Sequence, residues 1–241
     1  MISPSTTFAD GRRKTREVAV GSVKIGSNYP IRIQSMTHSK TADIHATTDQ
    51  IMKLADMGCE IVRVTVQGKK EAYACEEIKN TLLSKGYTIP IAADIHFFPP
   101  AAFIVADYVD KVRINPGNFV KCANLNTSPL YSKEQQLIDN TKIIETFIPL
   151  IEKCKKNGVA IRIGTNHGSL SQRVMYLYGD TPQGMVFSAI EFGKICVAQD
   201  FHNFLFSMKS SNTQIMIQAY QMLVSKMNDL CWDYPLHLGV T

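Results

Sequence analysis

The chain has 241 residues, of which 45% are hydrophobic and 20% are charged, and its formal net charge is +5. This composition is ordinary for a globular protein and provides enough chain for one sizeable core. The small positive excess suits an anionic small molecule at least as well as a nucleic acid, and no apolar stretch approaches the roughly 20 residues of a membrane span.

The N-terminal region predicts a flexible tail over residues 1–16. It has no apolar segment typical of a signal peptide, so we expect a cytoplasmic protein. Basic residues 12–14 and Arg16 form the one basic cluster of the chain. We interpret this cluster as a solvated flank rather than a nucleic-acid-binding arm.

The cysteines are too scattered to predict a metal cluster. No two of the six form a C-x-x-C pair; they are Cys59, Cys75, Cys122, Cys154, Cys196 and Cys231. In a chain without a secretion signal we expect reduced thiols and no metal site built from them.

Residues 17–241 predict one domain in which short apolar strands alternate with helices. Residues 17–26 predict a hairpin that turns at Gly21 and Ser22. The expected strands then cover residues 31–36, 61–66, 89–95, 111–115, 159–165, 204–210 and 235–241. The expected helices cover 41–58, 69–86, a short segment from 99, 133–156, 170–178, 182–197 and 212–227. Gly58 and Gly86 end the first two helices, and Thr181 with Pro182 begins a later one.

Regular alternation of strands and helices predicts an α/β fold with a parallel sheet. Seven such steps without a Gly-x-Gly-x-x-Gly loop favour a TIM-type (β/α)8 barrel over a dinucleotide-binding fold. The count is one strand short, so we expect the barrel to lack its last strand and helix in this chain.

The stretch ADIHF (93–97) places a carboxylate and an imidazole at the end of a strand that is otherwise buried. Because side chains alternate between the two faces of a strand, Asp94 and His96 share one face, and Ala93 and Ile95 take the other. The other strands repeat this pattern near their carboxyl ends, with polar residues of one parity: Arg63, Thr65, Arg113, Asn115, Arg162, Asn166, Ser207, Lys209 and His237. The apolar parity must pack against the helices of a barrel, so we expect the polar parity to point inward.

Four of these inward side chains are cations, namely Arg63, Arg113, Arg162 and Lys209. They repel one another at one barrel mouth, and we expect Asp94 to balance only one of them. Guanidinium groups match phosphate oxygens, and the amides of Asn115 and Asn166 add further donors. The pattern therefore predicts a bound anion with at least two negative charges, such as a diphosphate. Asp94 and His96 would orient its hydroxyls or exchange protons with them.

These residues and their neighbours resemble the 4-hydroxy-3-methylbut-2-enyl diphosphate synthase family, iron–sulfur enzymes of the non-mevalonate isoprenoid pathway. The resemblance runs in the family's order from about residue 30 to residue 241. The matching stretches are IQSMTHSKTAD (33–43), IVRVTV (61–66), ADIHF (93–97), VRINPGN (112–118), IRIGTNHGSL (161–170), FSMKSS (206–211) and PLHLGVT (235–241).

The resemblance implies an oxidoreductase whose barrel seats 2-C-methyl-D-erythritol 2,4-cyclodiphosphate at its carboxyl-terminal mouth. The family opens this ring reductively, with loss of water, to the linear allylic diphosphate. The implied catalytic residues are Asp94 and His96. The implied substrate-binding residues are Arg63, Arg113, Asn115, Arg162, Asn166 and Lys209, and the implied rim residues are Gln34, Thr37 and Lys40.

The family also carries a [4Fe-4S] cluster on a C-terminal domain, and a ferredoxin or flavodoxin supplies electrons to the homodimer. From the resemblance we expect this chain to lack such a domain, and its cysteine spacing offers no replacement. We therefore expect this chain to bind the substrate but no cluster, and to turn over nothing by itself. The stretch 117–132 is longer than bacterial members commonly show, which we interpret as a surface insertion.

Two interpretations of other classes remain open. A metal-dependent barrel hydrolase or lyase would use Asp94, His96 and His237 as ligands. The chain has no second His-x-His pair, and the four cations disfavour a metal. A non-catalytic anion- or RNA-binding protein would spread its basic residues over an outer face, whereas here they alternate inward.

Overall fold

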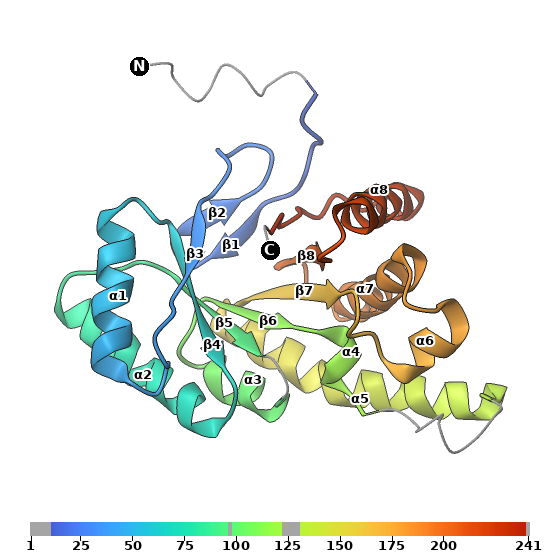
Figure 1. The fold of residues 1–241 in the computed structure, drawn as a ribbon, viewed down its shortest axis with the longest axis horizontal. Coiled ribbons are helices and arrows are strands. Elements are labelled where there is room, and N and C mark those ends of the chain that lie inside the picture. The colour runs from blue at the N-terminus through green and yellow to red at the C-terminus, as the bar shows by residue number, and fades with distance from the viewer. Residues whose placement is uncertain (1–10, 96–97, 122–130, 240–241) are drawn as a thin grey trace.

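The computed structural model describes residues 11–95, 98–121 and 131–239, and its main feature is a curled parallel sheet (Figure 1). Six strands pair in the order β3-β4-β5-β6-β7-β8. They are β3 (Gln34–Met36), β4 (Ile61–Val66), β5 (Ile91–Ile95), β6 (Lys111–Ile114), β7 (Ala160–Asn166) and β8 (Phe204–Lys209). The helices are α1 (Ile44–Asp56), α2 (Lys69–Ser84), α3 (Pro100–Val105), α4 (Pro116–Phe119), α5 (Lys133–Asn157), α6 (Gln172–Tyr178), α7 (Pro182–Ala198) and α8 (Thr213–Asp229).

This arrangement confirms the predicted α/β barrel architecture with an N-terminal hairpin. Helix boundaries follow the sequence signals closely: the side chain of Thr181 caps α7, and Gly58 and Gly86 adopt φ values of +90° and +82° after α1 and α2. The short α4 was not predicted. Its signal is the Asn115-Pro116 pair, in which the asparagine accepts a hydrogen bond from Gly117 N and the proline takes the first helical turn.

Two predicted strands are wrong in extent. The first begins at Gln34 rather than at residue 31, and Ile31 and Ile33 are 67% and 61% exposed. It lies at the edge of the described sheet, where only β4 pairs with it. The last, over 235–241, is an isolated parallel bridge between Phe206 and Leu236, with residues 240–241 outside the described range.

The apolar parity of the strands faces the helices, as predicted. Val64, Ala93 and Ile161 belong to one large core cluster together with residues of the surrounding helices. Apolar area removed from water stabilises this layer by about 25 cal/mol per Å2. The opposite parity is left to line the inside of the curled sheet.

The hairpin closes the inside of the sheet at the amino ends of the strands. Strands β1 (Val18–Val20) and β2 (Val23–Ile25) pair antiparallel. Val18 and Val20 form a separate apolar cluster with strand residues of the inward parity: Ile61, Ala92, Ala160 and Leu205. We call this hairpin the plug (residues 18–25). Asn203 fixes its position, because the Asn203 side chain accepts from Ala19 N (2.8 Å) and donates to Ala19 O (3.0 Å).

The basic residues at the N-terminus bond to the segment that follows α8. Arg13 donates to the carbonyl oxygens of Tyr234 (2.9 Å) and Trp232 (2.6 Å). Arg16 forms an ion pair with Asp233 and lies 4.2 Å from the centre of the Tyr234 ring. The interpretation of this cluster as a solvated flank is therefore wrong for Arg13 and Arg16.

We predict that Asn203→Ala lowers the free energy of unfolding by about 1–2 kcal/mol, because it leaves both polar groups of Ala19 without their partner. Urea denaturation measures this change. The matched control is Asn80→Ala on α2, an exposed asparagine, which should shift stability by less than about 0.5 kcal/mol. Equal effects of the two variants would show that Asn203 does not hold the plug.

Candidate functional site

Strand register brings the predicted site residues together inside the carboxyl half of the sheet. Asp94 on β5 pairs with Arg113 on β6, and Arg113 pairs with Arg162 on β7. Paired residues of parallel strands point to the same side, so these three side chains lie next to one another. All three residues are at most 5% exposed. The sequence-based prediction of an inward charged cluster is thus confirmed for them.

Asp94 is shared by two arginines. Its Oδ1 accepts from Arg113 Nη1 at 2.9 Å, and its Oδ2 lies 3.7 Å from Arg63 Nη2. Its single negative charge is therefore shared between two arginines and still balances only one of the positive charges. Burial raises the pKa of Asp94, but the charges of Arg113, Arg63 and Arg162 outweigh burial and lower it below its ordinary value. Asp94 is therefore ionised at neutral pH.

Arg113 is fixed by a second set of bonds on the neighbouring strand. Its Nη2 donates to Gly164 O and to Asn166 Oδ1, each at 2.9 Å. These bonds leave the amide nitrogen of Asn166 as the group that can donate to a ligand. Arg113 thus links β5, β6 and β7 and has little freedom to move.

Arg162 differs from Arg113, because it forms no hydrogen bond or ion pair with any residue that the structure describes. It is only 5% exposed, and its Nε has no acceptor. Burial, followed by the charges of Arg113 and Arg63, lowers the pKa of Arg162 to about 9. A buried guanidinium without a partner is costly, which makes Arg162 the strongest sign that this place is built for an anion.

Lys111 is a further buried basic residue that the sequence-based prediction missed. It is 1% exposed, and its Nζ donates to Gln34 Oε1 at 2.7 Å. Burial, followed by the charges of Arg162 and Arg63, lowers the pKa of Lys111 well below its ordinary value. The signal was present in the sequence, since Lys111 has the same parity as Arg113 two residues later.

His237 also enters this positive environment. Its backbone N donates to Phe206 O (2.8 Å), and its carbonyl oxygen accepts from Tyr220 Oη (2.6 Å). Burial, followed by the charges of Arg162, Lys111, Arg63 and Arg113, lowers the pKa of His237 to about 2. The imidazole is therefore neutral near pH 7 and can accept or donate a hydrogen bond, but it adds no charge.

The remaining predicted residues occupy different places. Asn115 is buried and bonds the protein with both polar groups, accepting from Gly117 N (3.1 Å) and donating to Ser169 O (3.4 Å). Lys209 is exposed at the carboxyl end of β8. At the expected rim, the buried Thr37 has a hydroxyl without a partner among the described residues. His96 lies outside the described residues.

The described residues do not fit the iron–sulfur cluster that the family resemblance implies. Cys75, Cys154 and Cys196 are buried in the core, and burial raises the pKa of Cys75 and Cys154 to about 12. No group of three His, Cys, Asp or Glu side chains comes together within the described ranges. The metal-dependent hydrolase would need His96, which lies outside the described residues; of its other ligands, Asp94 already faces two arginines.

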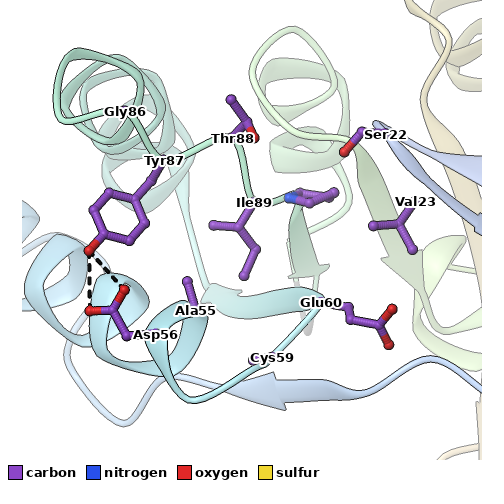
Figure 2. Close-up of a pocket in the computed structure, with 11 residues that line it drawn as sticks. Ser22, Val23, Ala55, Asp56, Cys59, Glu60, Gly86, Tyr87, Thr88 and Ile89 are labelled. Carbon is purple, nitrogen blue, oxygen red and sulfur yellow. Dashed lines mark hydrogen bonds between the residues drawn. The ribbon is translucent and has the colours of Figure 1, made fainter. Parts of the chain in front are cut away.

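A surface hollow of about 400 Å3 lies away from the cations (Figure 2). Its lining comes from the ends of α1 and α2, the hairpin turn and the amino ends of β4 and β5, and includes Asp56, Glu60 and Tyr87. Tyr87 Oη donates to Asp56 Oδ1 at 2.9 Å. The hollow therefore has an acidic edge and does not suit a phosphorylated ligand.

Among the described helices, none combines the length and the apolar character of a membrane span.

Comparisons with known proteins agree with this geometry. Residues 15–241 match the family described as the GcpE TIM-barrel domain. The 4-hydroxy-3-methylbut-2-en-1-yl diphosphate synthase (flavodoxin) of Protochlamydia amoebophila (strain UWE25) is 62% identical over 95% of this chain and 35% of that protein. The chloroplastic 4-hydroxy-3-methylbut-2-en-1-yl diphosphate synthase (ferredoxin) of Oryza sativa subsp. japonica is 56% identical over 95% of this chain and 31% of that protein. The chain thus spans about a third of the length of these curated relatives.

Solved structures share the fold at low sequence identity. A truncated 3-deoxy-D-arabino-heptulosonate 7-phosphate synthase from Thermotoga maritima matches with a TM-score of 0.56 and 9% identity over 93% of this chain and 69% of that chain. The dihydropteroate synthase of Yersinia pestis matches with a TM-score of 0.53 and 10% identity over 93% of this chain and 75% of that chain. These likenesses support the barrel architecture alone.

We predict that Lys111→Met raises the free energy of unfolding by about 1–3 kcal/mol, because it replaces a buried amine repelled by arginines with an apolar chain of similar length. Chemical denaturation in phosphate-free buffer measures the change. Lys70→Met on the exposed face of α2 is the control and should stay within about 0.5 kcal/mol. A destabilised Lys111 variant would mean that the hydrogen bond to Gln34 outweighs the cost of the charge.

The low pKa of His237 predicts a loss of stability in acid. The folded-state pKa of about 2 lies below the ordinary 6.5, so only the unfolded chain takes up this proton between those values. The contribution of the neutral His237 to the free energy of unfolding is complete above pH 6.5. It is lost as the pH falls, by at most about 1.4 kcal/mol per pH unit. Urea denaturation at pH 7, 6 and 5 should show a shallower loss for His237→Gln than for the parent. A His45→Gln control on α1 should follow the parent, and a His237 variant that also follows it would refute the assignment.

Proposed function

Because the chain belongs to the GcpE TIM-barrel family, we propose that its barrel is the substrate-binding part of a 4-hydroxy-3-methylbut-2-en-1-yl diphosphate synthase. The proposed ligand is 2-C-methyl-D-erythritol 2,4-cyclodiphosphate, seated at the carboxyl ends of the strands. The observation that carries this proposal is Arg162, a buried guanidinium with no partner among the described residues, beside two arginines that share one carboxylate. The relatives are named as synthases of 4-hydroxy-3-methylbut-2-en-1-yl diphosphate, which supports this proposal.

A cyclic diphosphate meets the electrostatic demand of this site. The positive charges of Arg63, Arg113 and Arg162 exceed the single negative charge of Asp94, and the surrounding protein screens them little. Phosphate oxygens would accept from the Arg162 guanidinium and from Arg63 Nε, which has no partner among the described residues. Lys209 at the rim and the amide nitrogen of Asn166 supply the outer contacts in this proposal.

Asp94 has a holding role in this proposal. An ionised carboxylate with both oxygens toward arginines is a poor proton donor, and it keeps Arg113 and Arg63 at fixed positions. The sequence-based assignment had Asp94 orient ligand hydroxyls or exchange protons with them; we propose instead that Asp94 positions Arg113 and Arg63, and that proton exchange falls to His96. His96 keeps its proposed place next to the substrate hydroxyls, and the neutral His237 can serve as a hydrogen-bond partner at the same mouth.

We propose that the whole protein opens the cyclic diphosphate reductively, taking up electrons and protons and releasing water. Relatives named for flavodoxin and for ferredoxin support one of these proteins as the electron donor. The described residues offer no ligand set for a cluster, so we assign no step to one and propose that this chain alone binds without turnover. We further propose that the whole protein is a homodimer and that it is cytoplasmic. The cysteines among the described residues are free thiols, as expected for that location.

Calorimetric titration of this chain with the cyclodiphosphate tests the proposal. We predict binding by the parent and an at least tenfold weaker affinity for Arg162→Ala, because Arg162 contacts no carboxylate among the described residues and is therefore available to the ligand. The matched control is Arg32→Ala, which removes an arginine paired with Glu60 (2.6 Å) away from the cation cluster. Absence of heat from a folded parent, or equal losses in both variants, would contradict the proposed site.

A further inference from the structure

Gly164 lies inside the curled sheet, at the centre of the cation cluster. It pairs with Ser207 on β8 and has the same inward parity as Arg162 and Asn166 on its own strand. Its φ lies outside the left-handed region, so the backbone conformation there does not require glycine. The reason for a glycine must lie in the space that a side chain would occupy.

That space is filled by Arg113. A Cβ on residue 164 would lie 2.5 Å from Arg113 Nε, 3.3 Å from Arg113 Cγ and 3.1 Å from Ser207 Oγ. The first distance is far below any real carbon contact. The Arg113 side chain therefore crosses β7 directly over this glycine, and a methyl group would displace it.

Arg113 cannot move aside without losing its contacts. Its Nη1 donates to Asp94 Oδ1, while its Nη2 donates to Gly164 O and Asn166 Oδ1, all at 2.9 Å. The side chain of Arg113 is only 6% exposed, which leaves no open solvent into which it can turn. A shift that relieves the clash breaks at least one of these bonds.

We infer that Gly164 is a positioning residue for the anion site, because its missing side chain is what allows Arg113 to reach Asp94 and Asn166 at the same time. The inference rests on the proposed function for the identity of the ligand. The packing of Arg113 over Gly164 is independent of that function, because it involves only atoms of the protein. The cluster of Arg113, Asp94 and Asn166 is thereby fixed before a ligand arrives, which lowers the ordering cost of binding.

A double-mutant cycle separates this role from a general packing role. The four proteins are the parent, Gly164→Ala, Arg113→Ala and the double variant, and the probes are the cyclodiphosphate and inorganic pyrophosphate. We expect each single variant to weaken binding about tenfold or more, and the double variant to bind no more weakly than Arg113→Ala. Once Arg113 is gone, the 2.5 Å clash is gone, and of those three contacts only the longer one to Ser207 Oγ (3.1 Å) remains. Independent losses that multiply in the double variant would overturn the inference.

Unfolding measurements on the same proteins test the inference without a ligand. Gly164→Ala should lower the melting temperature of the parent and have little effect in the Arg113→Ala background. If the parent bound neither probe, the proposed function would fail, while this stability cycle would still decide the role of Gly164. An equal destabilisation in both backgrounds would refute that role.

The cycle needs one control variant and one alternative background. Gly68→Ala at the start of α2 is the control, since a Cβ there meets only Glu71 Oε2 at 3.4 Å, and its effect should be the same with and without Arg113. If the unpaired Asp94 carboxylate prevented Arg113→Ala from folding, Arg113→Ala combined with Asp94→Asn would remove both charges and keep the space over residue 164 empty. The cycle is then run in that background, with the same expected and opposing results.

Discussion

The structure of the site depends on a charge imbalance in a buried place. One carboxylate, Asp94, contacts both Arg113 and Arg63, and Arg162 is left without an anion among the described residues. Such an arrangement costs stability, since buried charges are tolerated only when they are paired. The same causes, burial and the charges of Arg113 and Arg63, lower the pKa of Arg162 to about 9. In our proposal, the negative charge of a bound diphosphate offsets this cost.

The rest of the barrel separates stability from function by position along the strands. At the amino ends, the hairpin packs Val18 and Val20 onto apolar strand residues and closes that end, with the buried Lys111 in register with Ala92 and Ala160 of this cluster. At the carboxyl ends the inward residues become polar and charged, which is where TIM-type barrels carry their active sites. Arg113 joins three adjacent strands there, and Gly164 provides the space that it crosses.

Much of this could be predicted from the sequence, because the period of two along a strand is a local property. Alternation alone placed Asp94, Arg113 and Arg162 on the inner face, as the strand register confirms. Lys111 follows the same alternation but begins its strand, and the prediction considered only the carboxyl ends. The sharing of Asp94 between two arginines depends on distances across strands, which no local pattern contains. The shortened first strand and the single bridge at Leu236 depend likewise on which neighbours are present to pair with.

The most direct test of the central claim is a crystal structure of this chain soaked with 2-C-methyl-D-erythritol 2,4-cyclodiphosphate. The charge imbalance predicts phosphate oxygens within hydrogen-bonding distance of the Arg162 guanidinium, with the Asp94 to Arg113 pair unchanged. A ligand bound elsewhere, or an Arg162 side chain paired with a carboxylate of the protein, would show that the buried arginine has another purpose.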